Sequence, residues 1–593
     1  MVTRATRLRM RRSLRRGRRQ VGDIGVQAEE QLDQHLFKRL TNLASVRRFV
    51  IGWIMLMLLL CGGVIYQITV LADKYEGTRP LAGGIYTEGM VGVFTNANPM
   101  YAVSPVDAAV SKLLFGGLLK YDQSGQLAGD LAIRWSVDET GKIYKVVLRP
   151  DILWHDGTKL TAEDVVYTYQ TIQNPDAKSP LWSAWQGVTV EARDDRTILF
   201  TLPNVLASFP YALTNGIVPK HILGSTPAAQ LRSIQFDTVS PIGSGPFKWG
   251  AIQVTGQTPE SRQTQIALSP NDTYYNGAPQ LDQFRIHTFG DEASMIASFD
   301  RQELTAMSGL GAMPGLFAND LGVKDYSVPY MGEVGVFFKT SAPNLTDVKV
   351  RQALVQSINH QATLIGLPYP VSAVRGPLLK TQLGYVAEAQ QLSLNLAKSA
   401  ELLDAAGWTM GTNGIRQKDG KPLLLTLFAQ DTDELGTVVE RLSTQWQAIG
   451  VKIDAILQSD EELQKTVSER NYDMLLYGIS LGADPDVFAY WHSSQANAVS
   501  ANRLNFSEYK SAIADLALES GRTRIDPSLR AVKYRPFLDA WRTDAPALML
   551  YQPRYLYISR GEVRGFEPML LNASTDRLAN VEHWTIRQAK TAE

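Results

Sequence analysis

Cysteine is almost absent from this sequence. Among 593 residues there is one, Cys61, and it lies inside an apolar run. The rest of the chain therefore has no thiol with which to build a disulfide framework or a thiolate metal site. A lack of cysteine suits a protein that works outside the cell, but it does not establish export.

Histidine clusters and catalytic motifs are also scarce. No H-E-x-x-H motif occurs, and the glycine-rich stretch 240–246 lacks the Lys and Ser/Thr of a phosphate-binding loop. His155 stands beside one acid and has no second histidine at ligand spacing, so we interpret it as a structural turn residue. We therefore expect no catalytic residues, no metal site and no cofactor, and an exported enzyme is the least favoured function.

Long apolar runs are missing except for one, Phe49–Leu71, which has 23 residues and no charge. A helix of that length covers about 35 Å, which is enough to cross a hydrocarbon core of about 30 Å. A buried core helix is the alternative, but core helices of this length usually keep a polar face. The run predicts a single membrane span followed by a large extramembrane portion.

The net charge of zero hides an asymmetry. Residues 1–48 hold 13 Lys or Arg and 4 Asp or Glu, so the remainder of the chain carries a net charge of −9. Basic residues close to a span stay on the cytoplasmic side, which places this head inside the cell and residues 72–593 outside. A nucleic-acid-binding tail is the competing interpretation; because topology accounts for the charge, we expect no nucleic-acid partner. Residues 27–43 could form an amphipathic helix on the membrane surface.

Cys61 raises the question of lipidation. A bacterial lipoprotein signal places a small residue just before the modified cysteine, whereas Leu60 precedes Cys61 here. The basic head is also long for a signal peptide. We expect an uncleaved helical anchor.

The body after the span alternates helix and strand patterns. Residues 143–149 alternate as a strand, and Thr161 to Asp164 has the spacing of a capping box at a helix start. Apolar stripes follow at helical spacing, at 350/354/358, at 396/400/403 and from 435 to 449, and Gly407 and Gly450 end two of these helices. The pattern indicates an α/β body.

Several segments of this body resemble segments of a known protein family and follow one another in the same order as in that family. They are FGGLLKYDQSGQLAGDLAIRW, LRPDILWHDGTKLTAEDVVYTYQTI, SPIGSGPFKW, LSPNDTYYNGAPQLD, DVKVRQALVQSIN, LAKSAELLDAAGW, and the pair WQAIGVKID and NYDMLLYGISLGADPDVFAYW. Together they cover about residues 82–570 and resemble the extracytoplasmic solute-binding proteins of family 5, which serve peptide ABC transporters.

This resemblance implies an α/β fold, a two-lobe clamshell of the type II periplasmic-binding-protein kind, preceded by the one N-terminal transmembrane helix. The expected organisation is a cytoplasmic head at 1–48, the anchor at 49–71, a tether at 72–81, a first lobe at 82–330 and a second lobe at 331–545. Residues 546–593 would return to the first lobe. The two hinge crossings are expected near 330–339 and 547–557, both as strands.

The best candidate for ligand contact is Asp484-Pro485-Asp486. It follows a predicted buried strand at 472–478, and open α/β sheets commonly bind ligands at the carboxyl ends of their strands. The resemblance gives an aspartate here the role of pairing with a peptide's α-amino group. Relatives often carry another acid about three residues before the Asp-Pro pair, where this chain has Leu481, so Asp484 and Asp486 remain for that role. The alternative is that they simply cap a helix that starts near Val487.

Four further residues are weaker candidates for ligand contact. Tyr490 and Trp491 could line a side-chain pocket, and Asn98 lies where the family's first lobe approaches ligand. Arg375 could meet a peptide carboxylate, although a surface arginine is the favoured interpretation.

Taken together, the resemblance implies a monomeric, membrane-anchored protein that captures oligopeptides outside the cell and delivers them to the permease subunits of an ABC importer. The same clamshell could instead bind a nickel complex, an oligosaccharide or a signalling peptide, or act as a sensor.

Overall fold

The computed structural model describes residues 47–592 except 257, 259–261 and 498–502. The basic head at 1–46, with the amphipathic helix expected at 27–43, lies outside the described residues. The chain divides into two units, the first made of residues up to Arg79 with 588–593 and the second of Pro80–Arg587.

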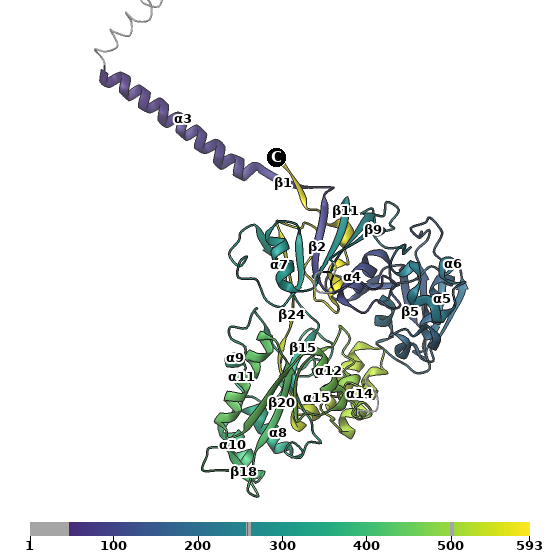
Figure 1. Ribbon diagram of the computed structural model, residues 1–593, viewed down its shortest axis with the longest axis vertical. Helices are drawn as coiled ribbons and strands as arrows, with labels where there is room; N and C mark the ends of the chain where they lie inside the picture. Colours follow the sequence, from purple (N-terminus) through teal and green to yellow (C-terminus); the bar gives the residue numbers. More distant parts are fainter. Residues whose placement is uncertain (1–46, 257, 259–261, 498–502, 593) are drawn as a thin grey trace, which may run out of the picture. The chain divides into compact units, whose positions relative to one another are not determined.

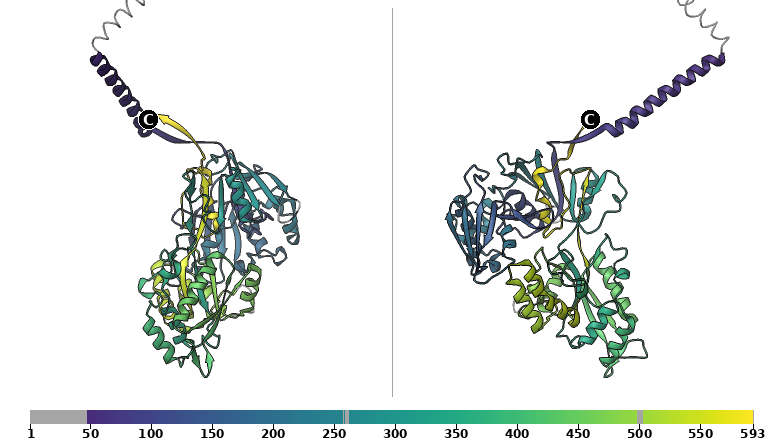
Figure 2. Two further views of the ribbon diagram at one scale, coloured as in Figure 1. Left: turned by 60° about the vertical axis from the view of Figure 1, so that its left-hand side comes forward. Right: turned by 180° about the vertical axis from the view of Figure 1, so that it is seen from behind.

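The first unit is built around helix α3 (Arg47–Tyr75). Within it, Phe49–Gln67 is long and apolar enough to cross a membrane, and none of it is buried by the residues that the structure describes. The stretch expected to be a tether, 72–81, contains the end of a helix and a strand. Residues 72–75 continue α3, because no glycine or proline interrupts the sequence before Gly77, and strand β1 (Glu76–Leu81) then pairs with β25 (Arg587–Ala592) near the carboxyl terminus (Figures 1 and 2).

The second unit contains two lobes, each organised around its own sheet. The first lobe has an eight-stranded mixed sheet with the path β13-β24-β12-β2-β11-β10-β9, in which β2 runs parallel to both of its neighbours. The strands are β2 (Ile85–Val91), β9 (Phe247–Thr255), β10 (Gln263–Pro270), β11 (Gln283–Phe289), β12 (Ala306–Leu310), β13 (Val323–Asp325), β14 (Val328–Pro329) and β24 (Arg554–Arg560). The carboxyl-terminal segment therefore supplies a strand to the sheet of the first lobe.

A four-stranded antiparallel sheet, in the order β5-β6-β8-β7, completes the first lobe. Helix α5 (Ala162–Gln173) packs on it and begins with the expected capping box at Thr161 and Asp164. The strands are β5 (Ala132–Val137), β6 (Ile143–Leu148), β7 (Thr189–Asp194) and β8 (Thr197–Thr201), with the hairpin β3 (Leu119–Tyr121) and β4 (Leu127–Gly129) nearby in the sequence. The other helices of this lobe are α4 (Pro105–Leu114), α6 (Lys220–Leu223) and α7 (Glu292–Asp300).

The second lobe has a six-stranded sheet in the order β16-β23-β15-β22-β20-β21, with helices on both faces (Figure 1). One apolar core takes side chains from α8, α10 and α11, and a second core takes them from α14 and α15. The strands are β15 (Gly332–Phe338), β16 (Ser372–Ala373), β20 (Leu424–Gln430), β21 (Lys452–Gln458), β22 (Met474–Ser480) and β23 (Ala547–Gln552). The helices are α8 (Val348–Gln356), α9 (His360–Leu364), α10 (Leu396–Ala405), α11 (Asp433–Ala448), α12 (Asp460–Glu469), α13 (Phe488–Trp491), α14 (Ala512–Arg522) and α15 (Pro527–Asp544), and β17 (Thr409–Met410), β18 (Arg416–Lys418) and β19 (Lys421–Pro422) form a small separate sheet.

The glycines expected to end two of these helices do so. Gly407 follows α10 and Gly450 follows α11, and both have a φ of +84°, a backbone conformation that favours glycine. The apolar stripe predicted for α11 is buried at Val438, Leu442 and Trp446.

The chain passes between the two sheets at residues 330–331 and at Pro553, within the two stretches expected for the hinge crossings. Strand β14 is followed by β15 in the second lobe, whereas β23 belongs to the sheet of the second lobe and β24 to that of the first. The expected single strand at 547–557 is broken at Pro553, which has no N–H to donate to a sheet. The return to the first lobe therefore comes at Pro553 rather than at 546.

Candidate functional site

The Asp-Pro-Asp segment lies in the loop between β22 and α13 of the second lobe. Strand β22 runs parallel to β20, and the loop leaves from its carboxyl end, where open α/β sheets commonly hold ligands. The backbone N–H groups of Leu481 and Gly482 both donate to the carbonyl of Met331, at 2.9 and 3.0 Å. The start of the loop is thus fixed to the first hinge crossing.

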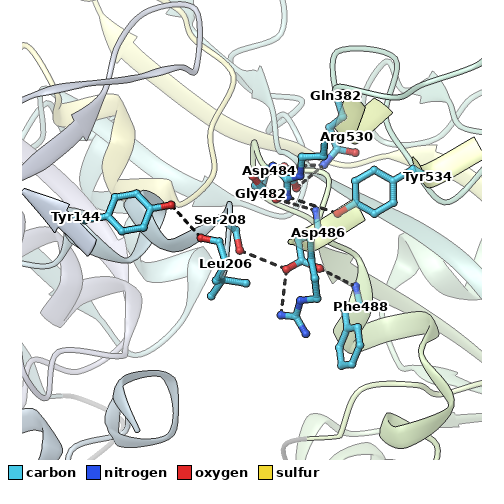
Figure 3. A network of polar contacts seen from close by, with 11 residues as sticks. Tyr144, Leu206, Ser208, Gln382, Gly482, Asp484, Asp486, Phe488, Arg530 and Tyr534 are labelled. Atoms are coloured by element: carbon cyan, nitrogen blue, oxygen red, sulfur yellow. Dashed lines mark hydrogen bonds and ion pairs between the residues drawn. The ribbon is translucent and has the colours of Figure 1, made fainter. Parts of the chain in front are cut away.

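Asp484 is held by a buried arginine. Its two carboxylate oxygens accept hydrogen bonds from the two terminal nitrogens of Arg530 on α15, at 2.6 and 2.5 Å, in a bidentate ion pair (Figure 3). Burial alone would lower the pKa of Arg530, but the Asp484 carboxylate raises it above its usual range. Gln382 donates to the carbonyls of Gly482 and Asp484 at 2.9 and 3.2 Å. Asp484 therefore has an internal partner for each of its oxygens.

Asp486 instead faces the first lobe. The Ser208 hydroxyl of that lobe donates to its Oδ2 at 3.3 Å (Figure 3). The same oxygen lies 3.1 Å from a terminal nitrogen of Arg522 on α14. The N–H of Ala207 donates to the carbonyl of Arg522 at 2.9 Å, which adds a backbone bond between the lobes. The Tyr144 hydroxyl steadies this segment by donating to the Leu206 carbonyl at 3.1 Å. Asp486 thus lies where the two lobes meet.

The helix-capping alternative for the two aspartates describes part of the geometry. The N–H of Phe488 donates to Asp486 Oδ1 at 3.3 Å, and the N–H of Asp486 donates to Asp484 Oδ1 at 2.9 Å. The helix that follows, α13, has only 4 residues. Capping therefore accounts for one oxygen of Asp486. It does not explain the contacts of the other oxygen with Ser208 and Arg522.

The other predicted ligand contacts lie in different environments. Tyr490 follows in α13, and its hydroxyl donates to the Ser480 carbonyl at 2.5 Å, which closes the loop on itself. Trp491 is completely buried between the rings of Phe337 and Trp541. The structure places Trp491 in the core of the second lobe, and not on a pocket wall as expected, because its ring points to the apolar side of α13.

No contact that the structure describes brings Asn98 or Arg375 to the aspartate loop, the loop between β22 and α13 that holds Asp484 and Asp486. Asn98 is wholly buried in the first lobe, where its amide donates to Asp237 at 3.1 Å. Arg375 is exposed, and its carbonyl accepts a hydrogen bond from the Gln391 N–H at 2.7 Å. Asn98 therefore fixes the turn in which it lies.

Sequence reasoning missed Arg530, Ser208 and Arg522. One signal was available for Arg530, because Tyr534, Phe537 and Trp541 follow it at helical spacing and form the buried stripe of α15. An arginine on such a stripe requires a buried acid partner. For Ser208 the sequence carries no comparable signal, since its partner lies 278 residues away.

Two further motifs prove to be structural. His155 is the turn residue that the sequence predicts: its ring accepts from the Gly243 N–H and contacts the Gly245 carbonyl, each at 3.1 Å, and burial lowers its pKa to about 4. The segment Gly478–Gly482 has the G-x-S-x-G spacing of a nucleophile elbow, but Ser480 ends strand β22 in ladder register with Gly332, without the sharp strand-to-helix turn of an elbow. Among the described residues no group of three His, Cys, Asp or Glu side chains could hold a metal ion.

Comparison with known proteins agrees with this architecture. Residues 126–500 match the family described as bacterial extracellular solute-binding proteins, family 5 middle. The oligopeptide-binding protein AppA of Bacillus subtilis is 27% identical over 537 residues, which cover 86% of this chain and 93% of that protein.

Solved structures show the same fold. The structure of AppA from Bacillus subtilis in complex with a nonapeptide has a TM-score of 0.68 at 24% identity, with 86% of this chain and 100% of that chain covered. NikZ from Campylobacter jejuni in complex with Ni(L-His) has a TM-score of 0.71 at 24% identity, with 85% and 99% covered. These neighbours are type II periplasmic binding proteins of mixed α/β content, as the sequence predicts. The match of residues 126–500 spans more than half of the chain, which therefore belongs to family 5 of the bacterial extracellular solute-binding proteins.

Proposed function

We propose that this protein captures oligopeptides between its two lobes, outside the cell, and delivers them to the permease of an ABC importer. The observation that carries the proposal is the position of Asp486, which extends from the loop after β22 and contacts Ser208 of the opposite lobe. A ligand enclosed between the lobes would meet this carboxylate. The relative AppA, whose name and whose nonapeptide complex both indicate peptide binding, supports a peptide as the ligand class.

Within this proposal the two aspartates have different roles. Asp484 positions the loop, because both of its oxygens are taken up by Arg530. Asp486 is the acid that meets the peptide's α-amino group, because it lies where the two lobes meet and its contacts with Ser208 and Arg522, at 3.3 and 3.1 Å, are single rather than bidentate. A charge-assisted bond to a partly desolvated ammonium is stronger than a neutral hydrogen bond.

A screen of the full chain in detergent against a mixed peptide library tests the function. Peptides should raise the thermal midpoint, since a ligand at 100 times its Kd stabilises the native state by about 2.7 kcal/mol. Oligosaccharides and a nickel–histidine complex serve as competing ligand classes, and calorimetry should confirm one site per chain. Stabilisation by one of these competitors, with none by any peptide, would reject peptide capture.

We also propose that α3 anchors the protein in the cell membrane by Phe49–Leu71, with the basic head in the cytoplasm. A solute-binding protein has to stay near its permease, and a helical anchor would replace a lipid at Cys61.

Membrane extraction tests the anchor. Alkaline carbonate should leave the full chain in the membrane pellet and release a variant that lacks residues 1–71, because carbonate strips proteins held only at the membrane surface and a spanning helix resists it. Protease added outside intact cells should digest the body and spare an epitope at the amino terminus. Release of the full chain by carbonate, or a mature protein that begins at a lipidated Cys61 by mass spectrometry, would contradict the anchor.

A further inference from the structure

A pocket of about 600 Å³ lies in the first lobe. It is bounded by the β3–β4 hairpin, by the loop between β10 and β11, and by the carboxyl-terminal segment 565–583, which returns to this lobe after the second hinge crossing. No described residue of the second lobe lines it. A ligand in this pocket would therefore occupy a site separate from the one between the lobes.

The charged side chains of this pocket are mostly acidic. Asp122, Glu567 and Glu582 line it, and Lys120 is the one lysine or arginine among its described lining residues. None of the three carboxylates lies within ion-pair distance of a lysine or arginine in the part of the chain that the structure describes. The Lys120 ammonium instead donates to the Ala579 carbonyl at 3.0 Å. The pocket therefore holds negative charge that the protein does not compensate.

Two of these acids each have one oxygen left for a ligand. The side chain of Glu582 is 2% exposed, and its Oε1 accepts a hydrogen bond from the Asn276 amide and lies 3.8 Å from the His583 ring. Its Oε2 accepts none from any described residue. Asp122 likewise uses only Oδ1 in its own turn, where the Ser124 N–H donates to it at 2.9 Å. A buried carboxylate oxygen without a donor is costly, and a cation from solution would supply the donor.

The rest of the wall is partly apolar. Met569, which is 7% exposed, and the half-buried ring of Tyr121 both line the pocket. Carboxylates next to an apolar wall suit an aliphatic chain that carries ammonium groups. A metal ion fits less well, because no group of three His, Cys, Asp or Glu side chains among the described residues could hold one.

We propose that this pocket binds an aliphatic polyamine, a small organic cation with two or more ammonium groups on a hydrocarbon chain. One ammonium donates to Glu582 Oε2, and a second meets the exposed carboxylates of Asp122 and Glu567. The chain between them lies on Met569 and Tyr121. Because the hairpin and the carboxyl-terminal segment both contribute to the site, the ligand stabilises the return of that segment to the first lobe. The site does not depend on peptide capture.

Calorimetry on the full chain in detergent tests the site, with spermidine as the probe. Its N1,N8-diacetyl derivative keeps the chain but only one charge, and should bind at least about tenfold more weakly. Glu582→Gln keeps an acceptor for Asn276 and removes the buried charge, so it should also weaken spermidine by about tenfold or more. Glu567→Gln changes an exposed acid and should weaken spermidine by about threefold.

Glu191→Gln is the matched control, because Glu191 is exposed on β7 of the same lobe and does not line the pocket. It should leave the affinity for spermidine unchanged. An equal loss in Glu191→Gln and Glu582→Gln, or displacement of spermidine by an equal concentration of magnesium ion, would show general attraction to acidic surface and overturn the inference. Binding that Glu582→Gln leaves unchanged, or no binding at all, would overturn it too. Peptide capture would stand in each case, because it uses a different part of the molecule.

Discussion

Replacing Arg530 by methionine is expected to destabilise the protein by about 3–5 kcal/mol, because the change leaves a buried carboxylate without its partner. The side chains of Arg530 and Asp484 are 6% and 10% exposed, and the pair is bidentate. The loss of unfolding free energy is measured by chemical denaturation of the full chain in detergent, with a spectroscopic probe in the second lobe.

Two comparisons make this expectation specific. Arg535→Met changes an exposed ion pair with Asp539 on the same helix, so it should cost less than about 1 kcal/mol. The double variant Asp484→Leu/Arg530→Met should recover much of the stability that Arg530→Met loses, because it removes both buried charges together. A loss for Arg530→Met no larger than that of Arg535→Met would show that the pair is not buried as described.

Substitutions at Asp484 and Asp486 distinguish the roles of the two aspartates. Asp484→Ala leaves the Arg530 guanidinium buried and unpaired, so it should lower stability and weaken free-amine and N-acetylated peptides equally. Asp486→Asn removes the charge, keeps one acceptor oxygen for the Phe488 N–H and should weaken free-amine peptides selectively. A selective loss in Asp484→Ala would instead assign the peptide's amine to Asp484.

The local pattern of the sequence predicted much of the fold. The capping box at Thr161 and the glycines after α10 and α11 act through neighbours a few residues away, so their effect is written in short stretches of sequence. The order of the motifs along the chain, through the family resemblance, also predicted the two-lobe α/β body, which the solved structures share.

Contacts between distant segments were not predictable in this way. The sequence places Asp484 and Asp486 on one loop, but it does not state that Arg530 binds the first while Ser208 and Arg522 contact the second. Trp491 shows the same limit, since a four-residue helix has no period long enough to indicate which side faces the core. The pairing of residues 76–81 with β25 was likewise not predictable, because the two segments are far apart in the sequence.

Arg577→Met should destabilise the first lobe by about 3–5 kcal/mol, for the same physical reason in a different core. Arg577 forms an ion pair with Glu88 on the central strand β2, and the two side chains are 1% and 0% exposed. The Ser308 hydroxyl donates to the same carboxylate oxygen at 2.6 Å, and the Arg577 guanidinium carbon lies 5.4 Å from the centre of the Tyr555 ring. Denaturation of the full chain, followed by a probe in the first lobe, measures the effect.

Arg301→Met is the control for this pair, because it breaks an exposed ion pair with Glu303 in the same lobe and should cost less than about 1 kcal/mol. A comparable small loss for Arg577→Met would contradict the burial of the Glu88 pair. A large loss has a wider consequence, because Arg577 lies in the segment that follows the second hinge crossing. That segment supplies β24 to the sheet of the first lobe and the partner of a buried acid at its centre. The first lobe can then reach its full stability only after the second lobe has been synthesised and the chain has returned through Pro553.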